Sequence, residues 1–361
     1  MFDFIPLEFY TPIYYNTMLI IVLFAFIQLQ TKGYIILNSK KREYASFLLL
    51  LAVTLYMGLR PISGKYFVDM GMYNYEFEQY ASGAEITKTR DLLWSVFMKL
   101  CSGIMTAQLF FLLCATLYIL PLYIASKKWL GVDRYFLFLM LITSLSFWAY
   151  GTNGIRNGIA TSIFVLGLSF FKHKYWKYSL LAVSYLIHGS MLIPIAAFVL
   201  TLFYKNPKHY LFGWLLVIPI SLIFGGLLEP FFMSLGFGGD RAGYLTMNEF
   251  DDQFSSTGFR WDFLVYSMAA VYAGYYFIVK RKFKDTKYIQ LFNIYVSANA
   301  FWILVIRASY SNRFAYLSWF LMAVIIFYPF FKKQFFKKQQ KVLAYIIILY
   351  FGFTYSMFLI K

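Results

Sequence analysis

The stretch that decides the fold, residues 150–194, reads YGTNGIRNGIATSIFVLGLSFFKHKYWKYSLLAVSYLIHGSMLIP. Arg156 begins an apolar segment directly after the breaker cluster 151–154, and His188 interrupts a second apolar segment beyond the basic turn 172–177. Ionisable groups in or beside a bilayer are costly and therefore mark functional candidates. A helix N-terminus offers free N–H groups and a positive dipole, so Arg156 predicts an anion site. The alternative for Arg156 is a side chain that extends from a helix end to the membrane surface. The alternative for His188 is a buried structural role.

Composition assigns the chain to the membrane proteins. The chain has 361 residues, of which 61% are hydrophobic and 14% charged, and its mean hydropathy is +0.62. These values are too apolar for a water-soluble protein of this length. Apolar runs of about 20 residues recur from end to end, which indicates an all-α polytopic membrane protein. We expect one integral membrane domain over residues 1–361 and, since the start lacks a basic segment, no cleaved signal peptide.

Charge sorting predicts the topology. We expect about ten full transmembrane helices, over residues 14–31, 44–59, 106–126, 134–150, 156–171, 209–228, 261–279, 288–306, 313–331 and 342–360. When the loop after the first span is placed on the inside, the inside loops contain 22 of the 33 basic residues. Thirteen of the 16 acidic residues then lie outside. This agrees with the positive-inside rule and places both termini outside. The net charge of +17 is thereby explained without a nucleic-acid partner.

One segment, residues 178–204, does not fit a simple crossing. It is too short for two spans, and a single span would turn the later basic loops outward. We therefore expect a re-entrant pair of short helices with its break at His188. Such breaks occur inside membranes only where protein or a water-filled cavity satisfies the backbone, so His188 is expected to lie in a cavity. Two long external loops are expected at residues 60–105 and 229–261, and the first of them ends in an apolar segment with helical spacing.

Arginine and lysine divide between the two faces. Of the 22 inside basic residues 19 are lysine, whereas seven of the 11 outside are arginine. Arginine grips phosphate or carboxylate with two hydrogen bonds, so these arginines indicate a polyanionic ligand. We expect Arg60, Arg156, Arg307 and Arg313 to converge on one outward-facing mouth. The predicted substrate-binding residues are Arg60, Arg241, Arg260, Arg307, Arg313, Tyr73 and Tyr244. Structural ion pairs with Asp69, Asp91, Asp240 and Asp262 are the alternative.

The candidate catalytic residues are Arg156, Asp69 and His188. Asp69 lies in the first external loop near cationic groups, where a carboxylate can act as a base toward a hydroxyl. A histidine in a cavity titrates near neutral pH and is the other candidate base. We expect neither a metal nor a cofactor, because the chain lacks HExxH, Walker and GxGxxG motifs and its two cysteines lack metal-binding spacing.

These residues together resemble the EpsG-type family, which belongs with the Wzy polysaccharide polymerases of bacteria. The resemblance is carried by Gly58-Leu59-Arg60, by Asp69 followed by Tyr73, by Arg156-Asn157-Gly158-Ile159-Ala160, by the break Leu186-Ile187-His188-Gly189-Ser190, and by Arg313. Gly158 departs from the expected pattern, which has a larger residue at this position.

The resemblance implies a metal-independent glycosyltransferase, a polysaccharide polymerase in the multi-pass bacterial plasma (inner) membrane, with its active site facing the periplasm or exterior. Such an enzyme moves a growing chain from undecaprenyl diphosphate to a sugar hydroxyl of a new undecaprenyl-diphosphate-linked oligosaccharide repeat. Its fold would be similar to that of membrane-embedded glycosyltransferases that use lipid phosphates. Its partners would be the lipid-linked donor and acceptor, membrane lipids and, in some systems, a chain-length regulator.

Two other classes use similar residues. A transporter or flippase of lipid-linked glycans also needs external arginines, and an O-antigen ligase or membrane acyltransferase works on the same face. Within the polymerase interpretation we favour Asp69 as the base, by analogy with other lipid-phosphate glycosyltransferases. His188 then contacts the diphosphate or the acceptor.

Overall fold

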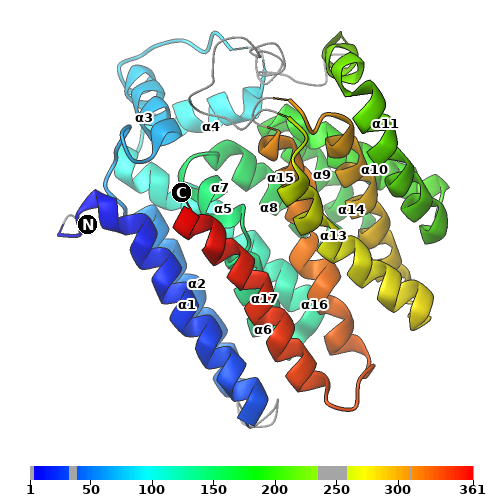
Figure 1. Ribbon diagram of the computed structural model, residues 1–361. Helices are drawn as coiled ribbons and strands as arrows, with labels where there is room; N and C mark the ends of the chain where they lie inside the picture. Colours follow the sequence, from blue (N-terminus) through cyan, green and yellow to red (C-terminus); the bar gives the residue numbers. More distant parts are fainter. Residues whose placement is uncertain (1–3, 32–38, 89, 235–257, 309–310, 361) are drawn as a thin grey trace. The chain divides into compact units, whose positions relative to one another are not determined.

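The computed structural model describes residues 4–31, 39–88, 90–234, 258–308 and 311–360 (Figure 1). Within these residues every regular element is helical. The chain divides into two compact units, which we call the first unit (residues 1–188 and 330–361) and the second unit (residues 189–329).

The helices of the first unit are α1 (Leu7–Thr31), α2 (Ser39–Gly58), α3 (Val68–Ala81), α4 (Leu92–Ser102), α5 (Ala107–Leu130), α6 (Arg134–Ile142), α7 (Phe147–Thr152), α8 (Ile155–Ser169), α9 (Lys174–Ile187) and α17 (Gln339–Ile360). Those of the second unit are α10 (Leu192–Phe203), α11 (Pro207–Ser234), α13 (Trp261–Tyr275), the π-helical turn η5 (Tyr276–Lys280), α14 (Thr286–Leu304) and α15 (Asn312–Trp319). A further helix, α16 (Met322–Lys332), begins in the second unit and ends in the first.

Helix α5 is the centre of the first unit and packs against α2, α6 and α8. Its ends follow from local chemistry. Thr106 caps its N-terminus by accepting a hydrogen bond from Leu109 N, and Gly131 ends it with a positive φ of 59°. The first and last helices, α1 and α17, lie side by side and run in opposite directions (Figure 1). The Tyr355 hydroxyl donates to Asn16 Oδ1 at 2.7 Å across this pair.

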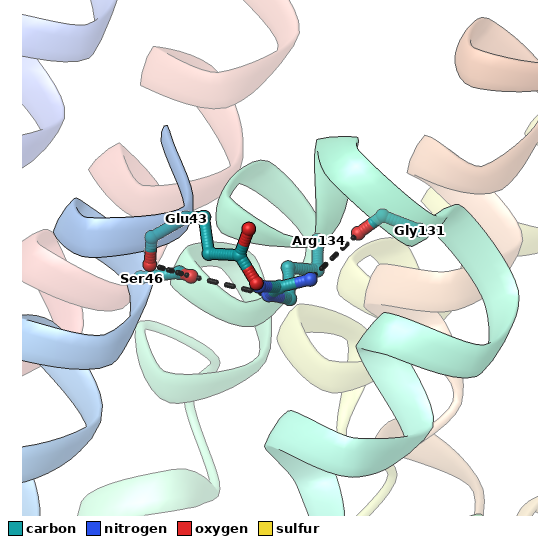
Figure 2. Close-up of polar contacts among 4 residues, drawn as sticks. All are labelled: Glu43, Ser46, Gly131 and Arg134. Atoms are coloured by element: carbon teal, nitrogen blue, oxygen red, sulfur yellow. Dashed lines mark hydrogen bonds and ion pairs between the residues drawn. The ribbon is translucent and has the colours of Figure 1, made fainter. Parts of the chain in front are cut away.

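Arg134, at the start of α6, is the buried charge that fastens α6 to the beginning of α2 (Figure 2). Its Nη2 forms an ion pair with Glu43, its Nε donates to Ser46 Oγ at 3.3 Å, and its Nη1 donates to Gly131 O at 3.3 Å. The Arg134 side chain is 5% exposed and that of Glu43 is 56% exposed. The guanidinium therefore depends on Glu43 far more than the solvated Glu43 carboxylate depends on Arg134.

A second ion pair lies beside the first. Arg42 contacts Asp133 at 3.2 Å, so two consecutive residues of α2 bind two consecutive residues at the start of α6. Both pairs lie where the positive-inside rule predicts an inside surface. Some inside arginines of this chain therefore connect helices as well as marking topology.

Asn299, fully buried in α14, organises the second unit. Its Oδ1 accepts from Trp214 Nε1 of α11 at 2.8 Å, and its Nδ2 lies 3.2 Å from Ser267 Oγ of α13 and 3.0 Å from Ser318 Oγ of α15. Ser267 also accepts from Trp319 Nε1 at 2.7 Å. One amide thus fixes three helices against α14, and its polar atoms are paired inside an apolar interior.

The described helices agree with a multi-pass membrane protein. Six described segments are long and apolar enough to cross a membrane. The ten predicted ranges all fall on helices, but 134–150 and 313–331 are each divided into two. Thr143 and Ser144 bond back to the carbonyls of Leu139 and Leu141 at the first division, which explains why α6 ends there. The number of about ten full spans stays a prediction.

The segment 178–204 contains the predicted break. α9 ends at Ile187, His188 is extended, and a short 3-10 turn at Gly189–Met191 leads into α10. The break is confirmed, and the re-entrant arrangement stays a prediction. The first long loop, 60–105, contains the expected helix α4 and also α3, whereas most of the second long loop lies outside the described residues.

The unequal exposure of Arg134 and Glu43 leads to a stability prediction. Glu43→Ala should lower the free energy of unfolding by about 1–2 kcal/mol, because it leaves a buried guanidinium without its counter-charge. The double variant Glu43→Ala/Arg134→Met should regain part of that loss, since the buried charge is then absent. Thermal unfolding in detergent measures both. Arg260→Met, which removes a pair with the 44% exposed Asp262, is the control and should change little. A double variant less stable than Glu43→Ala would contradict this interpretation.

Candidate functional site

The α8–α9 hairpin brings Arg156 and His188 together. Helices α8 and α9 pack side by side along their lengths, and Ser184 Oγ donates to Ala160 O at 2.8 Å between them. Gly167 allows close contact near the turn, because a Cβ there would lie 3.3 Å from Lys177 O. The helices are antiparallel and of similar length, so the start of α8 lies beside the end of α9. Arg156 and His188, 32 residues apart in sequence, therefore occupy the same end of the hairpin.

The start of α8 is held against the short helix α7. Asn157 Nδ2 donates to the Tyr150 hydroxyl at 3.0 Å, and both residues are buried. Gly158 lies so close to α7 that an added Cβ would be 2.8 Å from Tyr150 O and 3.2 Å from the Tyr118 ring. The small residue at position 158 is therefore a packing requirement in this chain. Its close contact fixes the first turn of α8, which carries Arg156.

Asp91 connects the two predicted residues. Its Oδ2 lies 3.0 Å from Arg156 Nη1 and 3.6 Å from His188 Nδ1. The three side chains are largely but not fully buried, with exposed fractions of 8% for Asp91, 17% for Arg156 and 12% for His188. We call Asp91, Arg156 and His188 the Asp91 cluster.

The backbone of Asp91 is unusual. Asp91 is the N-cap residue of α4, and its φ of 51° and ψ of 39° place it in the left-handed region. Its carboxylate makes no hydrogen bond to its own helix, although capping is the usual role of an Asp at this position. A non-glycine residue in this region costs of order 1 kcal/mol and such residues concentrate at functional sites. The chain holds Asp91 in this conformation while its carboxylate contacts Arg156 and His188.

Tyr73 of α3 interacts with the start of α8, and Asp69 interacts with Tyr73. They are four residues apart and so share one face of α3. The Tyr73 hydroxyl interacts with the backbone N–H of Arg156, which lies in the first turn of α8 where N–H groups have no partner within the helix. Burial raises the pKa of Tyr73 to about 12, while the Arg156 charge opposes this rise and Asp69 adds to it. Tyr73 therefore stays a neutral hydroxyl at physiological pH, close enough to both charged residues to interact with them.

An aromatic layer supports this arrangement. The Tyr73 ring packs edge-on against Trp94 of α4, with centroids 5.4 Å apart, and Trp94 lies 5.9 Å from Phe110 of α5. Phe77, one turn beyond Tyr73, packs on Phe110 at 5.0 Å. These contacts fix α3 and α4 to α5, and so fix the elements that supply Tyr73 and Asp91.

The geometry can bind an anion. Arg156 and Asp91 together are neutral, so the attraction for an anion comes from the N-terminus of α8 and from His188 when it is protonated. In the described parts of the chain no three His, Cys, Asp or Glu side chains lie close enough together to hold a metal ion. The expectation of a reaction without metal or cofactor stays a prediction.

The EpsG family model matches residues 47–361. The chain belongs to the EpsG family. The resemblance seen in the sequence is thereby confirmed, and the match includes the whole Asp91 cluster. Membership indicates a polymerase-like role in polysaccharide synthesis. A search of curated proteins and a search of solved structures each found no match.

Arg60 of this EpsG-family chain is buried, with 1% of its surface exposed. Its Nη1 donates to Met57 O, its Nη2 donates to Thr152 O at 3.1 Å, and Phe67 lies 5.2 Å from its guanidinium carbon. Burial lowers the pKa of Arg60 to about 10, so it stays charged at neutral pH. Arg60 joins the end of α2 to the end of α7, just before α8. Its predicted contact with substrate remains untested, and its observed contacts are with backbone carbonyls.

Three of the predicted arginines lie in the second unit. Arg260 forms a two-point ion pair with Asp262, which is the pairing that the alternative of structural ion pairs predicts. Arg313 and Arg260 both interact electrostatically with Tyr316. Arg307 donates to Leu222 O of α11 at 3.2 Å. Their convergence with Arg156 stays a prediction. The remaining candidates, Arg241 and Tyr244, lie outside the described residues.

Asp91 was missed as a site residue by the sequence reasoning, which considered it among the carboxylates of structural ion pairs. A usable signal was present, because Arg90-Asp91 directly precedes an apolar helix within a loop that also supplies Asp69. The sequence does not show which of the external carboxylates faces Arg156, since that depends on how α4 packs against α9.

Arg60 and Arg156 of the first unit should respond differently to substitution. Arg60→Lys should lose about 1.5–3 kcal/mol of stability, because one ammonium cannot reproduce the contacts to Met57 and Thr152. Arg156→Lys should change stability less and abolish polymer formation. Thermal unfolding and polymer yield, measured on the same preparations, separate the two effects. If Arg60→Lys is stable but inactive, Arg60 contacts substrate instead.

Gly158 offers a second test of the site geometry. Gly158→Ala should reduce polymer formation, because its Cβ would push α8 away from Tyr150 and move Arg156. Gly352→Ala in α17 is the matched control, since an added Cβ meets no atom within 4 Å there. Replacing a helical glycine by alanine normally stabilises by about 0.5–1 kcal/mol. Full activity of Gly158→Ala would show that the close contact does not position Arg156.

Proposed function

We propose that the chain polymerises undecaprenyl-diphosphate-linked oligosaccharide repeat units at the outer face of the bacterial plasma membrane. The observation that supports this proposal most is the Asp91 cluster, in which an arginine at a helix N-terminus and a histidine share one carboxylate. The chain is an EpsG family member, and its helices suit a membrane enzyme. A diphosphate is the kind of leaving group that such a site stabilises.

In the proposed reaction a sugar hydroxyl of the acceptor repeat attacks the anomeric carbon of the growing chain. The bond from that carbon to the lipid diphosphate breaks, and the diphosphate leaves with the electron pair. The N-terminus of α8 and hydrogen bonds from the Arg156 guanidinium stabilise the charge that develops on the diphosphate, which is the largest electrostatic demand of the step. The hydroxyl proton moves to a base of the enzyme.

We assign the base to Asp69 and the contact with diphosphate or acceptor to His188. Asp91 is already engaged by Arg156 and acts as a positioning residue that orients the His188 ring through Nδ1. Tyr73 presents a neutral hydroxyl between Asp69 and the start of α8, where it can hold a sugar hydroxyl or a phosphate oxygen.

The test of the function is the banding of surface polysaccharide in cells that lack the gene. Loss of long chains with single repeats retained supports a polymerase. Loss of the single repeats as well would indicate a ligase, and accumulation of undecorated lipid-linked repeats on the inner face would indicate a flippase. Restoration of long chains by the intact gene is the necessary control.

The roles of Asp69 and His188 separate in purified enzyme. Asp69→Asn should abolish turnover, whereas His188→Gln keeps a hydrogen-bond donor and should retain measurable turnover. The expected loss for His188→Gln is roughly tenfold to a hundredfold, as for one charge-assisted contact. His173→Gln, in the exposed turn before α9, is the matched control and should be fully active. Active Asp69→Asn with inactive His188→Gln would transfer the base role to His188.

A further inference from the structure

A groove of about 470 Å³ lies in the second unit between α11 and α13. Both helices pack against α14 (Figure 1), and the space between them is lined by side chains from both. The apolar lining includes Leu211, Phe212 and Leu215 of α11 and Met268, Val271 and Tyr272 of α13. Trp214 also lines the groove and is fixed by its hydrogen bond to Asn299 at 2.8 Å. The groove is therefore supported by the buried network of the second unit.

The groove walls are exposed and apolar. Phe212 is 62% exposed, Leu215 58% and Tyr272 65%. Both helices are long and apolar enough to cross a membrane, so these side chains face lipid. A groove between two membrane helices is filled by hydrocarbon in a bilayer, because water there would leave its hydrogen bonds unmade. The apolar walls by themselves do not distinguish one acyl chain from another.

One end of the groove is basic. Lys208, which lines it, lies in the first turn of α11, and Tyr275 and Val279 line the same end from α13 and η5. Lys280 and Arg281 follow directly, with Lys280 5.9 Å from the Tyr275 ring and Arg281 Nε donating to the Tyr276 hydroxyl at 2.7 Å. Tyrosines with adjacent basic residues are typical of a membrane–water interface.

The carboxylate that follows the basic residues 280–284 in the sequence is already engaged. Asp285 accepts hydrogen bonds from the backbone N–H groups of Lys287 and Tyr288 at the start of α14, and from the Tyr328 hydroxyl at 3.0 Å. It does not form an ion pair with Lys208. The basic end of the groove thus keeps its positive charge.

We propose that this groove binds one anionic phospholipid, with an acyl chain between α11 and α13 and its phosphate at Lys208. Charge sorting places the loops before α11 and after η5 inside, so the lipid belongs to the inner leaflet, where a basic pocket between membrane helices suits an anionic headgroup. The proposal does not depend on the proposed function, because no residue that lines the groove takes part in the proposed reaction.

The test uses the full chain purified in detergent and incubated with equal amounts of phosphatidylglycerol and phosphatidylcholine. Native mass spectrometry then counts the retained lipids. The intact chain should retain one phosphatidylglycerol in preference to phosphatidylcholine. Lys208→Gln should reduce that preference about fivefold. Lys341→Gln, at a basic residue of α17 in the first unit, is the matched control and should leave the preference unchanged.

A second variant tests the groove itself. Leu215→Trp should fill the groove and reduce retention of both lipids, with thermal unfolding used to show that the variant is folded. Equal retention of both lipids by the intact chain, or equal effects of Lys208→Gln and Lys341→Gln, would overturn the proposal. Displacement of phosphatidylglycerol by undecaprenyl phosphate at equal concentration would also overturn it, since the groove would then hold the carrier lipid.

Discussion

The interaction on which the candidate site depends is the contact of one carboxylate, Asp91, with both Arg156 and His188. The Arg156 guanidinium is a positive charge in surroundings of low polarity, where a charge without a counter-charge is costly. The Asp91 carboxylate supplies that counter-charge and still leaves the arginine beside the N-terminus of α8. The same contact joins three helices that are separate in sequence, α4, α8 and α9. The site and the packing of the first unit are therefore coupled.

The arginines of the first unit divide into two roles. Arg60 and Arg134 donate hydrogen bonds to backbone carbonyls and contact neighbouring helices, and each fixes one end of α2. Arg156, which pairs with Asp91, differs in that part of its side chain remains exposed at the start of α8. A guanidinium suits both roles because it offers several donors in one plane and stays charged when buried. Arginines of this chain thus connect helices, and contact of Arg156 with a substrate stays a prediction.

The sequence predicted the helical membrane class and the helix break at His188, whereas the packing of α8 on α9 that places Arg156 and His188 at one end was found in the structure. The two predicted features follow from apolar runs, breaker residues and charge sorting, all of which are local. Helix α3 was not predicted, because its buried Met70, Phe77 and Tyr80 are separated by tyrosines and carboxylates that hide the helical spacing. The role of Asp91 was also missed, since it arises from the packing of a loop helix. Such contacts depend on tertiary structure and leave no local pattern.

The most direct test of the Asp91 cluster is a double-mutant cycle on polymer formation by purified enzyme. Asp91→Asn and Arg156→Lys are measured singly and together, with thermal unfolding as the control for folding. If the two residues act as one unit, the double variant is no less active than the worse single variant. Losses that multiply would show that Asp91 and Arg156 act independently, and would contradict a site built on their shared contact.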